Sequence, residues 1–256
     1  MIRALLVGLA LALALSVLAF GSSTSAAGRP LVCLDPGHGG SAPGAVNGSL
    51  LEAEINLDVS VRLAERLADV GIDSVLTRIE NSTKSARDRY EFCNNALADL
   101  FVGVHTNSVA DSSIDGTLTI YFHNDDKVLA RDLQDAMLAG LVSTSPDPDS
   151  FIDFGLKKDA LGVVLKTDMP GAVVEPVFMS NTGEALRLLK TVEQCPNPAD
   201  NQCRRAQIVE ALFEGITAYL AAQPAPTATN TPGGPTPTPT PDADFCPPGH
   251  QRRNIC

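Results

Sequence analysis

Two histidines and two glutamates in this chain have the side chains and the local sequence that zinc chemistry requires. His38 lies within the turn DPGHGG at 35–40, whose glycines let the backbone approach a bound group closely. His105 ends an apolar run, and Glu52 precedes a long helical pattern. Two imidazoles and one carboxylate can hold zinc and leave a fourth position open for water. Glu175, embedded in apolar residues, is the candidate that moves a proton during hydrolysis.

Each of these residues also has an ordinary structural explanation. A glycine and proline cluster after a strand forms a tight turn, and a strand-end histidine is often hydrogen-bonded within a core. Glu52 and Glu54 both fall at a helix start, where the helix dipole favours negative charge. Asp35 fits either the turn itself or the orientation of a ligand imidazole. A buried acid such as Glu175 usually has a partner or a chemical role, because an unpaired charge is costly there.

Six short apolar runs rich in branched residues are predicted to be strands. They cover residues 31–35, 73–77, 100–105, 117–122, 162–166 and 172–178. Helical patterns are found at 55–70, 86–97, 127–141, 184–189 and 204–220. This alternation predicts a single α/β domain with a central mixed, mostly parallel sheet of about six strands flanked by helices. Loops at strand ends gather functional residues in such sheets, so the four candidates could share one site.

The two ends of the chain differ in composition from the rest. Residues 1–27 have a basic start, an uncharged apolar run and then small residues, which is the pattern of a cleaved secretory signal peptide. Residues 224–244 repeat proline and threonine and predict an extended linker, followed by a short cysteine-containing tail at 245–256. The folded domain is therefore expected at 28–223, in a secreted, extracytoplasmic protein with no stable membrane span.

The net charge limits the classes of partner, and the cysteine content is relevant to disulfide formation. The formal net charge of −11 argues against nucleic acid as a partner and against docking on anionic membranes. Six cysteines in an oxidising compartment favour disulfides. Proximity favours the pairs Cys195–Cys203 and Cys246–Cys256, whereas Cys33 and Cys93 are either bridged or simply buried. The sequence does not decide the oligomeric state, and we expect a monomer.

Four motifs, in chain order, resemble those of a known family. They are the first strand followed by DPGHGG, E-x-x-x-N-L from Glu52 to the residue after Asn56, V-H-x-N around His105, and VVEPVFMSN around Glu175. Over about 31–220, the chain resembles the zinc-dependent N-acetylmuramoyl-L-alanine amidases of the amidase 3 family. Four ordered motifs are far more specific than any one of them.

The resemblance implies a role for each candidate residue. It implies that His38, Glu52 and His105 bind Zn²⁺ and that Glu175 is the catalytic acid and base. Glu52 is favoured over Glu54 because it stands four residues before the asparagine of its motif. The implied catalytic domain occupies 28–223.

The implied function is that of a secreted, wall-associated hydrolase whose partner is peptidoglycan and which cleaves the amide between N-acetylmuramic acid and L-alanine. A zinc peptidase or amidase acting on another extracellular substrate would use the same four residues. A wall-binding module whose catalysis has decayed is a third hypothesis. It is suggested by Pro176-Val177-Phe178, where the family usually has Leu-Gly-Phe after its catalytic glutamate. The chain also departs from the family at Phe154-Gly155-Leu156, where an Arg-Gly pair is common.

Overall fold

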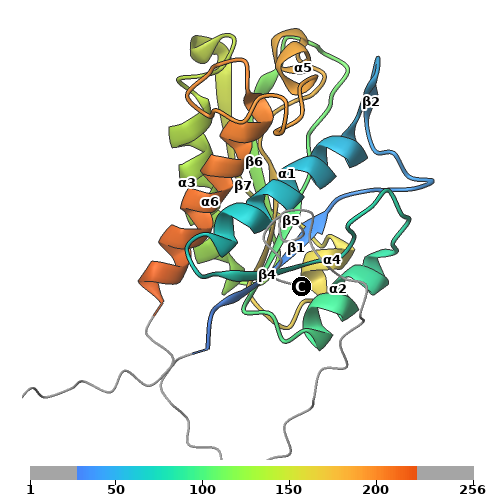
Figure 1. Ribbon diagram of the computed structural model, residues 1–256, viewed down its shortest axis with the longest axis vertical. Helices are drawn as coiled ribbons and strands as arrows, with labels where there is room; N and C mark the ends of the chain where they lie inside the picture. The colour runs from blue at the N-terminus through green and yellow to red at the C-terminus, as the bar shows by residue number, and fades with distance from the viewer. Residues whose placement is uncertain (1–27, 224–256) are drawn as a thin grey trace, which may run out of the picture.

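The computed structural model describes residues 28–223 of the 256-residue chain (Figure 1). The predicted signal peptide at 1–27, the linker at 224–244 and the tail at 245–256 with its Cys246–Cys256 bond all lie outside the described residues.

A six-stranded sheet with the order β4-β1-β5-β8-β6-β7 forms the centre of the described domain. Its strands are β1 (Leu31–Pro36), β4 (Asp73–Leu76), β5 (Leu100–Val104), β6 (Asp115–Tyr121), β7 (Phe151–Lys158) and β8 (Gly171–Glu175). Neighbouring strands run parallel except β6 and β8, which are antiparallel. A separate short pair joins β2 (Val46–Asn47) to β3 (Leu50–Leu51). The predicted fold class, a mixed and mostly parallel sheet flanked by helices, is confirmed.

Helices cover both faces of this sheet (Figure 1). One layer contains α1 (Glu52–Ala68), α3 (Asp126–Leu141) and α6 (Arg204–Ala222), and the opposite face carries α2 (Ala86–Asn95) and α4 (Gly162–Leu165). The 3₁₀ helix η1 (Pro148–Ser150) precedes β7, and α5 (Thr182–Leu188) follows β8. Within the described region, no helix combines the length and the apolar character that crossing a membrane requires.

The central strands are apolar on both faces because both faces are covered. In β5, Val102 and Val104 belong to the larger core cluster under α1, α3 and α6, whereas Phe101 belongs to the smaller cluster under α2 and α4. Alternate side chains of a strand point to opposite faces, so the near-continuous apolar run in the sequence serves two cores at once. This packing leaves the strand ends as the place where polar side chains can gather.

One predicted strand is wrong. Residues Gly162–Leu165 of this run form the short helix α4, and the sixth strand of the sheet is β7. A buried apolar run of four or five residues fits a strand and a helical turn equally well, so periodicity does not separate them. β7 is not predicted because it is an edge strand whose residues are mostly exposed or half-exposed, so it lacks an apolar run. Its pairing with β6 also shifts register at Thr117/Leu118.

Two disulfides lie within the described residues. The predicted Cys195–Cys203 bond is confirmed and closes the turn before α6. Cys33 and Cys93, whose state the sequence leaves open, are bridged and join β1 to α2 across a sequence separation of 60 residues. The second bond therefore fastens a helix to the strand that leads into the His38 turn.

Candidate functional site

His38 lies in a turn with an unusual backbone that directly follows β1. Its φ is +62°, and the next two residues, Gly39 and Gly40, have φ values of +128° and +58°. A non-glycine residue in the left-handed region costs about 1–2 kcal/mol, so neighbouring groups must hold this conformation in place. The turn presents the His38 imidazole toward α1 and β5, as its contacts with those segments show.

Gly37 lets this turn touch the second histidine. A Cβ atom at Gly37 would lie 2.4 Å from both Cε1 and Nε2 of the His105 ring. The Gly37 N–H donates to the Val104 carbonyl at 2.9 Å, which fixes the turn against the end of β5. The close approach of backbone and imidazole therefore requires glycine at this position.

Glu52 is the first residue of α1 and is 5% exposed. Its Oε2 accepts the Ala45 N–H at 2.9 Å, and its Oε1 accepts the Thr106 N–H at 3.3 Å. Glu54, two residues later, is exposed to solvent. The helix start therefore directs one of its two acids inward and the other outward.

The carboxylate of Glu52 lies between the two imidazoles. Its Oε1 is 3.0 Å from Nδ1 of His105 and 3.2 Å from Nε2 of His38. The two rings approach edge to face, with centroids 4.9 Å apart. One potential ligand atom from each of the three residues lies within 4.8 Å of the other two. The structure thus brings together the three residues that the sequence suggests as metal ligands.

Charge within this group favours a carboxylate beside a cation. Burial by itself would raise the pKa of Glu52, but hydrogen bonds with His105 and His38 hold it well below its usual range. Burial would lower the pKa of His105, yet its hydrogen bond with Glu52 and the charge of Glu175 raise it. The Glu52 carboxylate is therefore ionised, and its surroundings favour a positive charge beside it.

Glu175 ends β8, the strand beside β5. Burial raises its pKa to about 7, the opposing charge of His105 lowers it, and the like charge of Glu52 raises it further. Its Oε2 is buried and has no hydrogen-bond partner among the described residues. A buried carboxylate oxygen left without a partner usually serves chemistry or an absent group.

The donor set fits a zinc ion. Two imidazole nitrogens and one carboxylate oxygen are the ligands of catalytic zinc sites, which keep a further position for water. Glu175 lies close enough to His105 and Glu52 for their charges to act on its carboxyl group. A second group, formed by Cys195, Asp200 and Cys203, is also close enough to hold a metal, but its sulfurs are joined in a disulfide and provide no thiolate.

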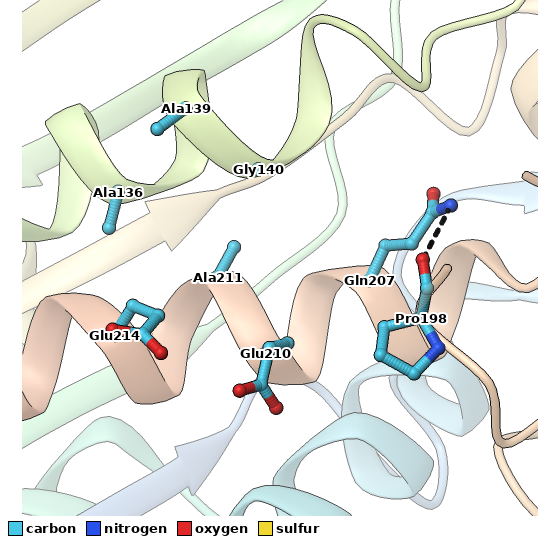
Figure 2. A pocket seen from close by; sticks show the side chains of 8 residues that line it. All are labelled: Ala136, Ala139, Gly140, Pro198, Gln207, Glu210, Ala211 and Glu214. Carbon is cyan, nitrogen blue, oxygen red and sulfur yellow. Dashed lines mark hydrogen bonds between the residues drawn. The ribbon is translucent and has the colours of Figure 1, made fainter. Parts of the chain in front are cut away.

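Two surface cavities in the helical layer contain none of these four residues. The larger, of about 440 Å³, lies between α3 and α6 (Figure 2). Small residues such as Ala139, Gly140 and Ala211 line it, and the Gln207 amide donates to the Pro198 carbonyl at its end. The other, of about 380 Å³, lies beside α1 and α6. Both follow from the packing of these helices and offer no catalytic arrangement.

Two buried arginines beside the site have no role predicted from the sequence. Arg78 and Arg89 contact the backbone of the His38 turn, although they lie far from it along the chain. Asp35 is not positioned to orient an imidazole, because its carboxylate accepts from Arg89 at 2.6 Å and from the Thr77 hydroxyl. In the sequence, Arg78 follows the second predicted strand and Arg89 lies in the second helical pattern. These positions do not show which groups the two side chains contact.

The described α/β domain thus brings together two imidazoles and a carboxylate that could hold a metal ion, with a buried, unpartnered glutamate on a neighbouring strand. The family model of N-acetylmuramoyl-L-alanine amidase matches residues 32–196. The match covers more than half of the chain, which therefore belongs to this family.

Individual relatives agree with the family assignment. N-acetylmuramoyl-L-alanine amidase LytC of Bacillus subtilis is 33% identical over 165 residues, which is 63% of this chain but only 32% of that relative. The germination-specific N-acetylmuramoyl-L-alanine amidase of the same organism is 27% identical over 77% of this chain and 82% of its own length. The chain thus spans about a third of the first of these proteins and most of the second.

Solved structures of the same kind superpose on the domain. N-acetylmuramoyl-L-alanine amidase AmiC2 of Nostoc punctiforme matches with a TM-score of 0.64 and 29% identity, covering 76% of this chain and 99% of that structure. The catalytic domain of the amidase CwlV from Paenibacillus polymyxa matches with a TM-score of 0.65 and 25% identity, covering 76% and 100%. The described domain thus has the extent of an amidase catalytic domain.

Proposed function

We propose that this chain is a secreted, zinc-dependent peptidoglycan hydrolase that cleaves the amide bond between N-acetylmuramic acid and L-alanine. The observation that carries the proposal is the His38, Glu52 and His105 group beside the unpartnered Glu175, in a member of the amidase family. We also propose that residues 1–27 direct export and that 28–223 form the catalytic domain, with 224–244 linking it to the tail.

In this proposal His38, Glu52 and His105 hold the metal, and Glu175 handles the proton. Bound zinc supplies a Lewis acid that polarises a carbonyl and acidifies water. The carboxylate of Glu175 takes a proton from the attacking water, which adds to the scissile carbonyl carbon. A pKa of about 7 suits this role because the group can be deprotonated near neutral pH and still return a proton.

The same carboxyl group completes the reaction. An amine is a poor leaving group until it is protonated, so Glu175 donates the proton it has taken to the nitrogen of L-alanine as the C–N bond breaks. The products are a lactyl carboxylate on the sugar and a free N-terminal L-alanine. The buried, unpartnered position of Oε2 keeps this oxygen free of competing hydrogen bonds.

The proposal predicts that Glu175→Gln lowers turnover by about 10²–10⁴-fold, while the zinc content stays near one ion per chain. The measurement is the release of N-terminal L-alanine from purified wall fragments, with metal analysis of the same samples. Glu54→Gln is the matched control, because Glu54 is exposed on the same helix start and should leave both values unchanged.

Removal of zinc with a chelator should abolish release of L-alanine, and zinc should restore it. Full activity of Glu175→Gln would contradict the assigned proton transfer. Absence of new N-terminal L-alanine from an active, zinc-loaded protein would point instead to another extracellular amide substrate.

A further inference from the structure

We propose that the buried guanidinium groups of Arg78 and Arg89 are positioning residues that hold the His38 turn in its metal-binding conformation. The inference rests on the proposed function, because it assigns a purpose to the conformation of that turn. The two arginines are 3% and 6% exposed.

Arg89 reaches the turn from α2. Its Nη1 donates to the Asp35 carboxylate at 2.6 Å and to the Pro36 carbonyl at 2.8 Å, and its Nη2 donates to the His38 carbonyl at 2.7 Å. One guanidinium therefore satisfies three acceptors along four consecutive residues. The His38 carbonyl belongs to the residue with the left-handed backbone, so this hydrogen bond stabilises the costly conformation directly.

Arg78 reaches the same turn from the loop after β4. Its Nε donates to the Pro36 carbonyl at 2.9 Å, and its Nη2 donates to the Gly37 carbonyl at 2.9 Å and to the Ala53 carbonyl at 2.7 Å. Ala53 follows Glu52, so Arg78 ties the segment that carries one ligand to the helix start that carries another.

Together the two groups satisfy the carbonyls of Pro36, Gly37 and His38. A guanidinium presents its donors in a flat fork, whereas an ammonium is a single point charge. At position 89, lysine could retain the charge opposite Asp35 but could not also reach the Pro36 and His38 carbonyls from one side chain. Supports of this kind around a ligand typically change metal affinity by about 10- to 100-fold when they are lost.

The sharpest test replaces Arg89 by lysine in the purified full chain, because Arg89→Lys keeps the charge that faces Asp35. Zinc affinity is measured by competition with a chelator, and hydrogen exchange is measured in the metal-free protein. Arg87→Lys is the matched control, since Arg87 lies on the same helix with its side chain 74% exposed. Arg78→Lys examines the second guanidinium in the same way and decides the question if Arg89→Lys does not fold.

For Arg89→Lys we expect zinc affinity to fall about 10- to 100-fold and the amides of Gly37 and Gly39 to exchange at least about tenfold faster. These amides donate to Val104 and Ala42 in the intact turn. Exchange at Phe101, in the neighbouring strand, should stay unchanged, which separates local loosening from general instability.

Zinc affinity within twofold of the parent, or unchanged exchange at both glycines, would overturn the proposal. If the parent chain binds no zinc, the proposed function fails, and the exchange comparison still decides whether the arginines hold the turn. A purely structural role would lower thermal stability and leave the zinc affinity of the folded protein unchanged.

Discussion

The carboxyl group of Glu175 owes its character to the strand that carries it. Val173 and Val174, which precede it in β8, are buried, and the side chain lies close enough to His105 and Glu52 for their charges to act on it. Desolvation is the largest effect and favours the neutral acid. The same burial that makes the group costly in the folded protein gives it a pKa suited to moving protons near neutral pH.

We expect the metal-free protein to lose stability as pH rises from about 4.5 to about 7. In this window Glu175 is ionised in the unfolded chain and still protonated in the folded protein, whose pKa for this group is about 7. The unfolded state then binds fewer protons, so the free energy of unfolding falls as pH rises, by roughly 3 kcal/mol. Denaturation with urea at a series of pH values measures this slope.

Glu175→Gln should remove this part of the pH dependence, because glutamine does not titrate. His105, whose pKa is also raised, adds a fall of the same sign above about pH 6.5. The variant keeps only part of this fall, because the hydrogen bond of His105 with Glu52 remains while the charge of Glu175 is lost. Glu54→Gln should keep the slope of the parent. An unchanged slope in Glu175→Gln would show that its carboxyl group has an ordinary pKa in the folded protein.

Gly37→Ala should disturb the site through sterics alone. The added Cβ would lie 2.4 Å from two atoms of the His105 ring, so the ring or the turn must move. We expect the free energy of unfolding, measured by urea denaturation, to fall by about 1–3 kcal/mol. Zinc affinity, measured by chelator competition, should also fall clearly. Gly162→Ala is the control, because its Cβ would make an ordinary 3.4 Å contact with Ala86; equal effects would contradict the steric argument.

At the scale of elements, α1 shows why part of the site can be predicted from sequence. Glu52 and Asn56 are one helical turn apart on the buried side, and the Asn56 amide donates to Glu52 at 3.3 Å while it accepts from the Thr106 hydroxyl at 2.9 Å. A spacing of four residues within a helix is visible in the sequence. Contacts of Arg78 and Arg89 with a turn some 40 to 50 residues earlier follow from the fold, so no local pattern predicts them.

The strands and helices likewise divide into those that the sequence predicts and those that it does not. The central strand β5 is predicted because both of its faces are buried and its apolar run is long enough. The edge strand β7 and the short helix α4 are not predicted, because burial on an edge is partial and four apolar residues fit either structure. The wrong secondary-structure predictions thus fall on the elements that contribute least to the buried core.

Gly155 permits the irregular pairing of β7 with β6. Its φ is +67°, and no atom lies within 4 Å of a Cβ built on it, so substitution carries a conformational cost with no clash. We expect Gly155→Ala to lower the free energy of unfolding by about 1–2 kcal/mol. Gly155→Asn should cost less, because asparagine tolerates left-handed backbone better. Equal costs for alanine and asparagine, measured by urea denaturation, would contradict this explanation.

At the scale of the whole molecule, the site depends on long-range assembly. His38, Glu52 and His105 come from three different segments, and Glu175 comes from a fourth, on neighbouring strand ends and a helix start. No pair of these segments forms the site alone. The site therefore exists only once these separate segments have assembled.

The two described disulfides should differ in their contribution to stability. The Cys33–Cys93 bond spans a sequence separation of 60 residues and the Cys195–Cys203 bond a separation of 8. Loop-closure entropy predicts roughly 4 kcal/mol for the first and about 2.5 kcal/mol for the second. Paired alanine variants compared by urea denaturation measure both, and a larger loss for the short loop would contradict the entropic account.

The position of the longer disulfide has a consequence for where the protein can work. Cys93 lies one helical turn after Arg89 on α2, and Cys33 lies on the strand that ends at the His38 turn. The covalent bond and the arginine therefore fasten the same helix to the same strand. We expect a newly synthesised chain held among cytoplasmic reductants to bind zinc poorly, and to gain full affinity once oxidation closes this bond. If the chain is exported as proposed, its metal site would then become fully competent only after the chain has left the reducing cytoplasm.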